Sequence, residues 1–268
     1  MPLSEFGSFA LLAALLVAAA TLGAPFEALS SPGEADVAMN HTASLPPTPD
    51  SVPEPLTPAE ATLRQAKADL ETLDHCLERG ESAAPERAPG VAIQRLRTLY
   101  LLAIEDEERI AEADRFRLAF GREAVVPDSE GGAAVVEAYG GALEVLRAKH
   151  AFWPNTRMRH LRAGLSELDA AVERHPRAVE IRYLRLVSTA FLPGILGRSG
   201  TAREDLAVVA HLLPGTVEVF PARTFEAMAA TVLELLVDGG KEPPPALVEA
   251  RNRARSLDRP LAPACQGA

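Results

Sequence analysis

The fold is decided by residues 157–176, which read RMRHLRAGLSELDAAVERHP. The large apolar residues of this stretch recur every three or four positions, so they lie on one face of a helix. They are Met158, Leu161, Leu165, Leu168 and Val172. Pro176 lacks a backbone N–H and disfavours helix in the residue before it, so the helix is predicted to end at Arg174 or His175.

Helices are also predicted on both sides of this segment. The downstream run has apolar residues at helical spacing until Pro193 and Gly194 end it, namely Ile181, Leu184, Val187 and Phe191. The upstream run covers residues 135–152 and is followed by a turn, Trp153-Pro154-Asn155, in which Asn155 or Thr156 is the predicted N-cap. Because both connections are short, we expect the three helices to be antiparallel neighbours.

One helix of this group resembles a known repeat. Gly164, Leu168, Ala171 and Pro176 have the spacing of the small, large, small and proline positions in the second helix of a tetratricopeptide (TPR) repeat. The first-helix signature of that family is absent, since Ala148 stands at its usual Trp position. More broadly, residues 90–215 resemble uncharacterised exported bacterial proteins with TPR-like helices. The resemblance implies a short TPR-like array of antiparallel helix pairs or a compact helical bundle, and it implies no activity.

The remaining chain adds helices and no strand pattern. Further helices are predicted at 57–80, 90–120, 201–213, 221–236 and 246–257. The second of these contains the charge run Glu105–Arg109, interpreted as a solvated stretch of continuous helix, and Thr201 is the predicted cap of the third. The sequence therefore predicts an all-α domain over residues 58–257, followed by a flexible tail over 258–268.

The N-terminal region has a different character. Residues 9–22, FALLAALLVAAATL, form an apolar run shorter than the ~20 residues of a membrane span, which is typical of a signal peptide within residues 1–24. Its leading segment carries Glu5 and no basic residue, so an inner-membrane anchor formed by Phe9–Ala24 and a buried helix stay open as alternatives. Residues 25–57 are rich in proline and are predicted to be a disordered linker. Export to the periplasm or the medium is the expected localisation.

The charge distribution argues against nucleic acid as a partner. The net charge is −10, and no Lys or Arg precedes Arg64, so most of the excess negative charge lies in the N-terminal region. The best basic stripe is Arg157, Arg159 and Arg162, which is interpreted as a solvated helix face. Aromatic residues make up 5% of the chain, which leaves few surfaces for base stacking.

No motif for a metal, a cofactor or a nucleophile is found. The six histidines lack metal-ligand spacing. The glycine-rich PGILGRSG at 193–200 lacks the Gly-x4-Gly-Lys-Ser/Thr spacing of a phosphate-binding loop and follows a predicted helix, so it is interpreted as a turn. Cys76 and Cys265 are the only cysteines. An exported chain permits a disulfide between them, and a buried Cys76 with a separate thiol at Cys265 is the alternative.

One polar group around the turn after residue 150 stands out as a candidate site. Its members are Lys149, His150, Trp153, Asn155 and Arg157, and we hypothesise that they form the rim of a groove for a partner. Local packing of Trp153 in the turn is the alternative. The predicted function is a non-catalytic, monomeric protein- or peptide-binding or scaffold module of the bacterial cell envelope, without cofactor. A helical enzyme with a site around His150 and Trp153, and a membrane-anchored assembly factor, are the alternatives.

Overall fold

The computed structural model describes residues 58–80, 88–123 and 132–257, and this part of the chain is built from helices with no strand. The all-α prediction is therefore confirmed. The α-helices are α2 (Pro58–Gly80), α3 (Ala88–Ala103), α4 (Glu107–Glu123), α5 (Gly132–His150), α6 (Pro154–Arg174), α7 (Val179–Thr189), α8 (Ser199–Leu212), α9 (Ala222–Asp238) and α10 (Pro245–Ser256). Two short 3-10 helices, η3 (Gly194–Leu196) and η4 (Leu213–Thr216), flank α8. The predictions for the signal segment, the linker, the tail and Cys265 fall on residues outside the described ranges.

The long helix predicted over residues 90–120 is two helices, so that prediction is wrong. The chain leaves helical geometry between Ala103 and Glu107. Asp106 Oδ1 accepts a hydrogen bond from the backbone N–H of Glu108 at 3.0 Å, which is the contact of an N-cap residue. The charge run therefore forms a turn that starts α4. Its acidic side chains stabilise the N-terminal end of that helix, which is the positive end of the helix dipole.

The central helix ends where its sequence predicts and begins earlier. α6 ends at Arg174, and the N–H of His175 still bonds to Ala171 O at 3.0 Å. Its first residue is Pro154, with Trp153 at the N-cap, so neither Asn155 nor Thr156 has the predicted capping role. A proline fits the first helical position because its missing N–H would have no partner there.

The predicted cap of α8 is also wrong. The helix begins at Ser199 and Arg198 occupies the N-cap position, without a side-chain cap bond. Gly197, which precedes it, has φ +68° in the left-handed region that glycine adopts without strain, and it ends η3. The glycine-rich segment therefore forms a turn between α7 and α8, as predicted.

α5 and α6 form a hairpin whose helices touch through their backbones. A Cβ atom placed on Gly164 would lie 2.4 Å from Gly141 O and 2.9 Å from Glu144 Cβ. Any side chain at Gly164 would therefore separate the two helices. The close approach lets Leu143 and Leu168, both fully buried, pack in the main hydrophobic cluster.

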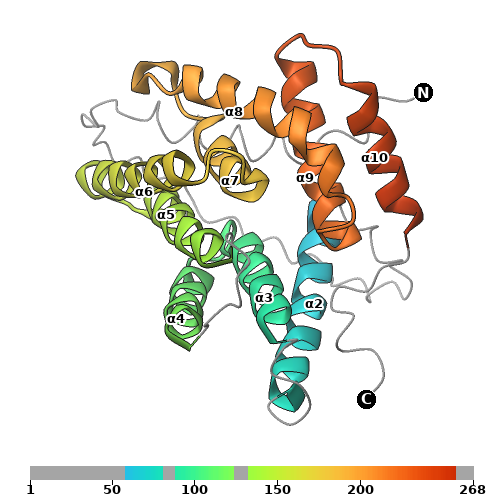
Figure 1. Ribbon diagram of the computed structural model, residues 1–268. Coiled ribbons are helices and arrows are strands. Elements are labelled where there is room, and N and C mark those ends of the chain that lie inside the picture. The colour runs from blue at the N-terminus through green and yellow to red at the C-terminus, as the bar shows by residue number, and fades with distance from the viewer. Residues whose placement is uncertain (1–57, 81–87, 124–131, 258–268) are drawn as a thin grey trace, which may run out of the picture.

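The helices follow one another as antiparallel pairs, and the chain curves back on itself (Figure 1). α5 packs against α3, α4, α6 and α7, which makes it the centre of the array. The start of α9 returns to the first helices, since Arg223 bonds to Asp69 of α2 at 3.1 Å and Thr224 bonds to Gln94 of α3 at 3.2 Å. This return gives a closed arrangement in which one hydrophobic cluster is formed by α2–α7 and a second by α7–α10.

Candidate functional site

Lys149 and His150, the last residues of α5, turn toward the end of α3. Lys149 Nζ donates to Ile104 O at 2.5 Å and lies 3.3 Å from a carboxylate oxygen of Glu105. His150 Nε2 donates to Ala103 O at 3.2 Å. The last carbonyls of a helix lack partners within it, and they attract a cation. These two predicted rim residues therefore close the C-terminal end of α3 with their polar atoms.

The turn between α5 and α6 carries two exposed aromatic side chains. Phe152 is 83% exposed and Trp153 is 69% exposed. Their rings meet edge to face, with centroids 5.1 Å apart and an interplanar angle of 88°. The indole N–H makes no hydrogen bond to any described residue, so the alternative of local turn packing does not explain this tryptophan. Adjacent exposed aromatics of this size are typical of contact surfaces.

The backbone on both sides of this aromatic pair is fixed. Trp153 has extended geometry at the N-cap of α6, and its carbonyl accepts from the N–H of Arg157 at 2.9 Å. The Arg157 side chain folds back, and its Nη2 donates to Ala151 O at 3.0 Å. Arg157 thus links the start of α6 to the turn through backbone carbonyls, while the two rings stay exposed.

A polar stripe runs along the exposed face of α6 from the turn. Asn155, Arg159 and Arg162 are exposed and follow one another at helical spacing. Neither Arg159 nor Arg162 makes an ion pair with a described residue. Two guanidinium groups, six and nine residues or about 1.7 and 2.5 helical turns beyond Trp153, are therefore available to an external anion.

The turn between α7 and α8 packs against the middle of α6 and carries an exposed apolar residue of its own. Leu192 and Leu196 pack against the small cluster formed by Ala148, Leu161 and Leu165, while Ile195 between them is 94% exposed. We call the exposed pair Phe152 and Trp153 on the α5–α6 turn the tip patch.

The structure divides the five residues that the sequence had grouped. Trp153 and Asn155 point outward, whereas Lys149, His150 and Arg157 bond to backbone carbonyls. Phe152 and Ile195 were missed. Their exposure could have been predicted from their position in the sequence. Each lies in a short turn near a proline, where no neighbouring helix covers an apolar side chain.

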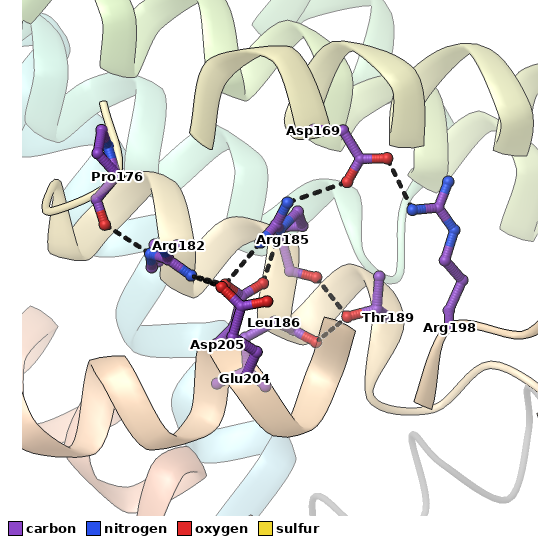
Figure 2. Close-up of polar contacts among 9 residues, drawn as sticks. All are labelled: Asp169, Pro176, Arg182, Arg185, Leu186, Thr189, Arg198, Glu204 and Asp205. Carbon is purple, nitrogen blue, oxygen red and sulfur yellow. Dashed lines mark hydrogen bonds and ion pairs between the residues drawn. The ribbon is translucent and has the colours of Figure 1, made fainter. Parts of the chain in front are cut away.

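The most buried charged cluster joins α6, α7 and α8 (Figure 2). The fully buried Asp205 accepts from Arg182 at 2.7 Å and from two nitrogens of Arg185 at 2.7 and 2.9 Å. Asp169 of α6 accepts from Arg185 at 3.1 Å and from Arg198 at 2.7 Å. Burial opposes the charged form of Arg185, but its hydrogen bonds and attraction to Asp205 outweigh burial and raise its pKa. Each charge in this cluster is paired within the fold, so the cluster is structural.

All three tyrosines of the chain lie near the centre of the array, on α3, α5 and α7. The rings of Tyr100 and Tyr139 meet edge to face with centroids 5.4 Å apart, and Tyr139 OH donates to Glu180 at 2.9 Å. Tyr183 OH donates to Thr231 Oγ1 of α9 at 3.3 Å. Burial is the main cause that raises the pKa of each tyrosine. The phenols therefore stay protonated at neutral pH, where none can act as a base.

The interior of the array is closed by an ion pair and by the segment leading into α9. Arg97 donates two hydrogen bonds to Glu180, at 2.7 and 2.6 Å, and its guanidinium lies over the Phe220 ring at 5.0 Å. Gln94 joins the same group through Arg97 at 3.2 Å. These contacts join α3, α7 and the segment before α9.

Two shallow depressions are found on the surface of the described residues. One shallow depression lies along α2, and another lies between the α6–α7 turn and α8, lined by Pro176, Arg177, Arg182, Ala207, Val208, His211 and Leu212. Within the described ranges no three His, Cys, Asp or Glu residues gather as a metal site would require. None of the helices described is both long and apolar enough to cross a membrane.

No protein-family model matches the sequence, and no curated protein or solved structure matches it either. The function of the chain is therefore inferred from the tip patch and its surroundings.

Proposed function

We propose that the chain is a non-catalytic binding module in which the helical array is a rigid scaffold for the tip patch. The observation that carries this proposal is the exposed pair Phe152 and Trp153 on a fixed turn. Tryptophan and arginine are the residues most often found at the energetic centre of binding surfaces. A pre-fixed backbone lowers the entropy that binding would otherwise cost.

The alternative of an enzyme centred on His150 and Trp153 has less support. A general base needs a free lone pair near a space that a substrate can enter. His150 Nε2 donates to the end of α3, and neither of the two depressions described above is lined by His150 or Trp153. Location in the cell envelope remains a proposal that rests on the apolar run before residue 24.

A site-specific crosslink tests the proposal in the cells that make the protein. A benzophenone amino acid would replace Phe152 in the full chain. In a matched control it would replace Val219, which is 74% exposed and lies in the segment between η4 and α9. We expect adducts from position 152 and none from position 219, analysed by mass spectrometry for protein or lipid. Equal yields at the two positions, or none at either, would overturn the proposed role of the tip patch.

A further inference from the structure

We propose that Cys76 and Cys265 form a disulfide that joins the segment after α10 to α2, and that the domain reaches its full stability only where this bond can form. The inference goes beyond the proposed function, because it depends neither on the tip patch nor on what the patch binds. It concerns how the two ends of the helical array are held together.

The state of Cys76 is the first observation. Cys76 lies near the end of α2, where it is half-buried and packs against the buried Leu73 and Val91. Its sulfur is disulfide-bonded, so it is not the free buried thiol that the sequence left open as an alternative. The chain contains one other cysteine, Cys265. Within a single chain, Cys265 is therefore the partner available to Cys76.

Contacts between helices bring the end of α10 close to α2. Arg255, in the last turn of α10, pairs with Glu226 of α9 at 2.6 Å. Three residues earlier on α9, Arg223 pairs with Asp69 of α2 at 3.1 Å. The first turns of α9 therefore contact both the end of α10 and the helix that carries Cys76.

The segment after α10 is long enough to cover the remaining distance. Eight residues lead from Leu257, the last described residue, to Cys265, and extended backbone spans about 3.5 Å per residue, which gives a reach of about 28 Å. Packed helices lie about 8–10 Å apart, and the seven residues from Asp69 to Cys76 cover about 10 Å along α2. Two helix spacings together with that length stay within this reach, because the spacings are measured across α2 and the length along it.

Formation of the bond removes two protons and two electrons from the two thiols. The oxidant that we name is the disulfide of a thiol oxidase. The thiolate of one cysteine attacks that disulfide to give a mixed disulfide, and the second thiolate then displaces the oxidase, which leaves as its dithiol. Such oxidants act outside the cytosol, where thiols are otherwise kept reduced. The bond therefore fits the export that the apolar run before residue 24 predicts on separate grounds.

The position of α2 explains why a covalent bond matters there. α2 is the first helix of the array, packs mainly on α3 and pairs with α9 through Asp69. A disulfide between Cys76 and Cys265 closes nearly the whole domain into one covalent loop, and closing a long loop lowers the entropy of the unfolded chain. The bond therefore stabilises the domain as a whole and holds the end of α2 in particular.

Peptide mapping identifies the bonded pair directly. The full chain would be produced in bacteria whose cytoplasm permits disulfides, its free thiols blocked by alkylation, and the protein digested with trypsin without a reductant. Cys76 then lies in peptide 68–79 and Cys265 in peptide 256–268, because trypsin does not cut after Arg259 when Pro260 follows. We expect one species that contains both peptides, is two hydrogens lighter than their sum and separates on reduction.

Urea unfolding measures what the bond contributes. Cys265→Ser should lower the urea midpoint by about 1 M, and a reductant should lower the midpoint of the unmodified chain equally. Cys265→Ser is more informative than Cys76→Ser, because Cys76 also packs against Leu73 and its replacement changes the core. The matched control is Cys265→Ser with the reductant added, whose midpoint should not move further.

Three results would overturn the inference. One is alkylation of both cysteines without prior reduction, since both thiols would then be free. Another is a bond that joins two copies of the same peptide, which would make it a link between chains. The third is an unchanged urea midpoint in Cys265→Ser, which would leave the bond without a role in stability. The crosslinking test of the tip patch involves neither cysteine, so failure of one proposal leaves the other standing.

Discussion

The body and the tip of the α5–α6 hairpin are built in opposite ways. In the body, Gly141 and Gly164 bring the helices into backbone contact, and Asp169 ties α6 to arginines of two other segments. At the tip, Phe152 and Trp153 stay exposed. The contrast teaches that stability is concentrated in contacts between helices, while the turn adds little to it and is available for binding.

The largest expected effect tests the charged cluster of the body. Asp205→Ala leaves Arg182 and Arg185 buried without their main partner, which should cost about 3–5 kcal/mol in the free energy of unfolding. Urea unfolding at neutral pH measures it. Glu204→Ala is the matched control, because Glu204 also accepts from Arg182, at 3.0 Å, but its side chain is 63% exposed. It should cost less than about 1 kcal/mol. Equal costs for the two variants would show that burial of the carboxylate does not determine how much its ion pairs stabilise the fold.

The next effect tests the helix crossing. Gly164→Ala places a methyl group against Gly141 O, and moving the helices apart should cost about 1–3 kcal/mol. Thermal unfolding followed by circular dichroism measures it. Gly90→Ala in α3 has open space around the new methyl group, so the better helix propensity of alanine should stabilise that variant by up to about 1 kcal/mol. Destabilisation by both would show that glycine itself, and not the crossing, matters.

A smaller effect on the free energy of unfolding is expected at alkaline pH, and it comes from Tyr139. The pKa of Tyr139 is raised by burial and by Glu180, so an unfolded chain loses this proton near pH 10 while the folded chain retains it. The unfolded state then binds fewer protons, and stability falls as pH rises above that value. In Tyr139→Phe the fall should be shallower by about 1.4 kcal/mol per pH unit. Unfolding at a series of pH values, with phenolate absorbance, measures it; an unchanged slope would mean that Tyr139 ionises freely when folded.

The smallest effect belongs to the tip. Trp153→Ala should change the free energy of unfolding by less than about 0.5 kcal/mol, because the side chain is 69% exposed. Phe225→Ala, at a fully buried aromatic of α9, should cost about 3–5 kcal/mol in the same urea titration. A large cost at Trp153 would erase the distinction between body and tip.

The sequence predicted what depends on local spacing. The apolar stripe of α6 is buried as its periodicity indicated, and Pro176 ends the helix as expected. The break at Asp106 was within reach, since an aspartate followed by two glutamates is a pattern for a helix start. One continuous helix was predicted over the charge run because the apolar residues on its two sides have the same helical phase.

The polar contacts between helices could not be predicted in this way. Arg97 and Glu180 are 83 positions apart, and Asp205 gives no sign in its local sequence that it will be fully buried. Spacing along a chain does not fix distance in space when several turns intervene. The exposure of Phe152 and Ile195 could not be predicted for the same reason, since it depends on which helices do not reach their turns.

The Asp205 cluster has a consequence for the order in which the chain is made. Ribosomes release the two arginines of α7 before the aspartate of α8 that neutralises them. Until α8 emerges, that part of the nascent polypeptide holds cations with no place in an apolar interior. We therefore expect a fragment that stops in the preceding turn to be less stable than one that includes α8, because Arg182 then lacks Glu204 and Asp205 while Arg185 retains only Asp169.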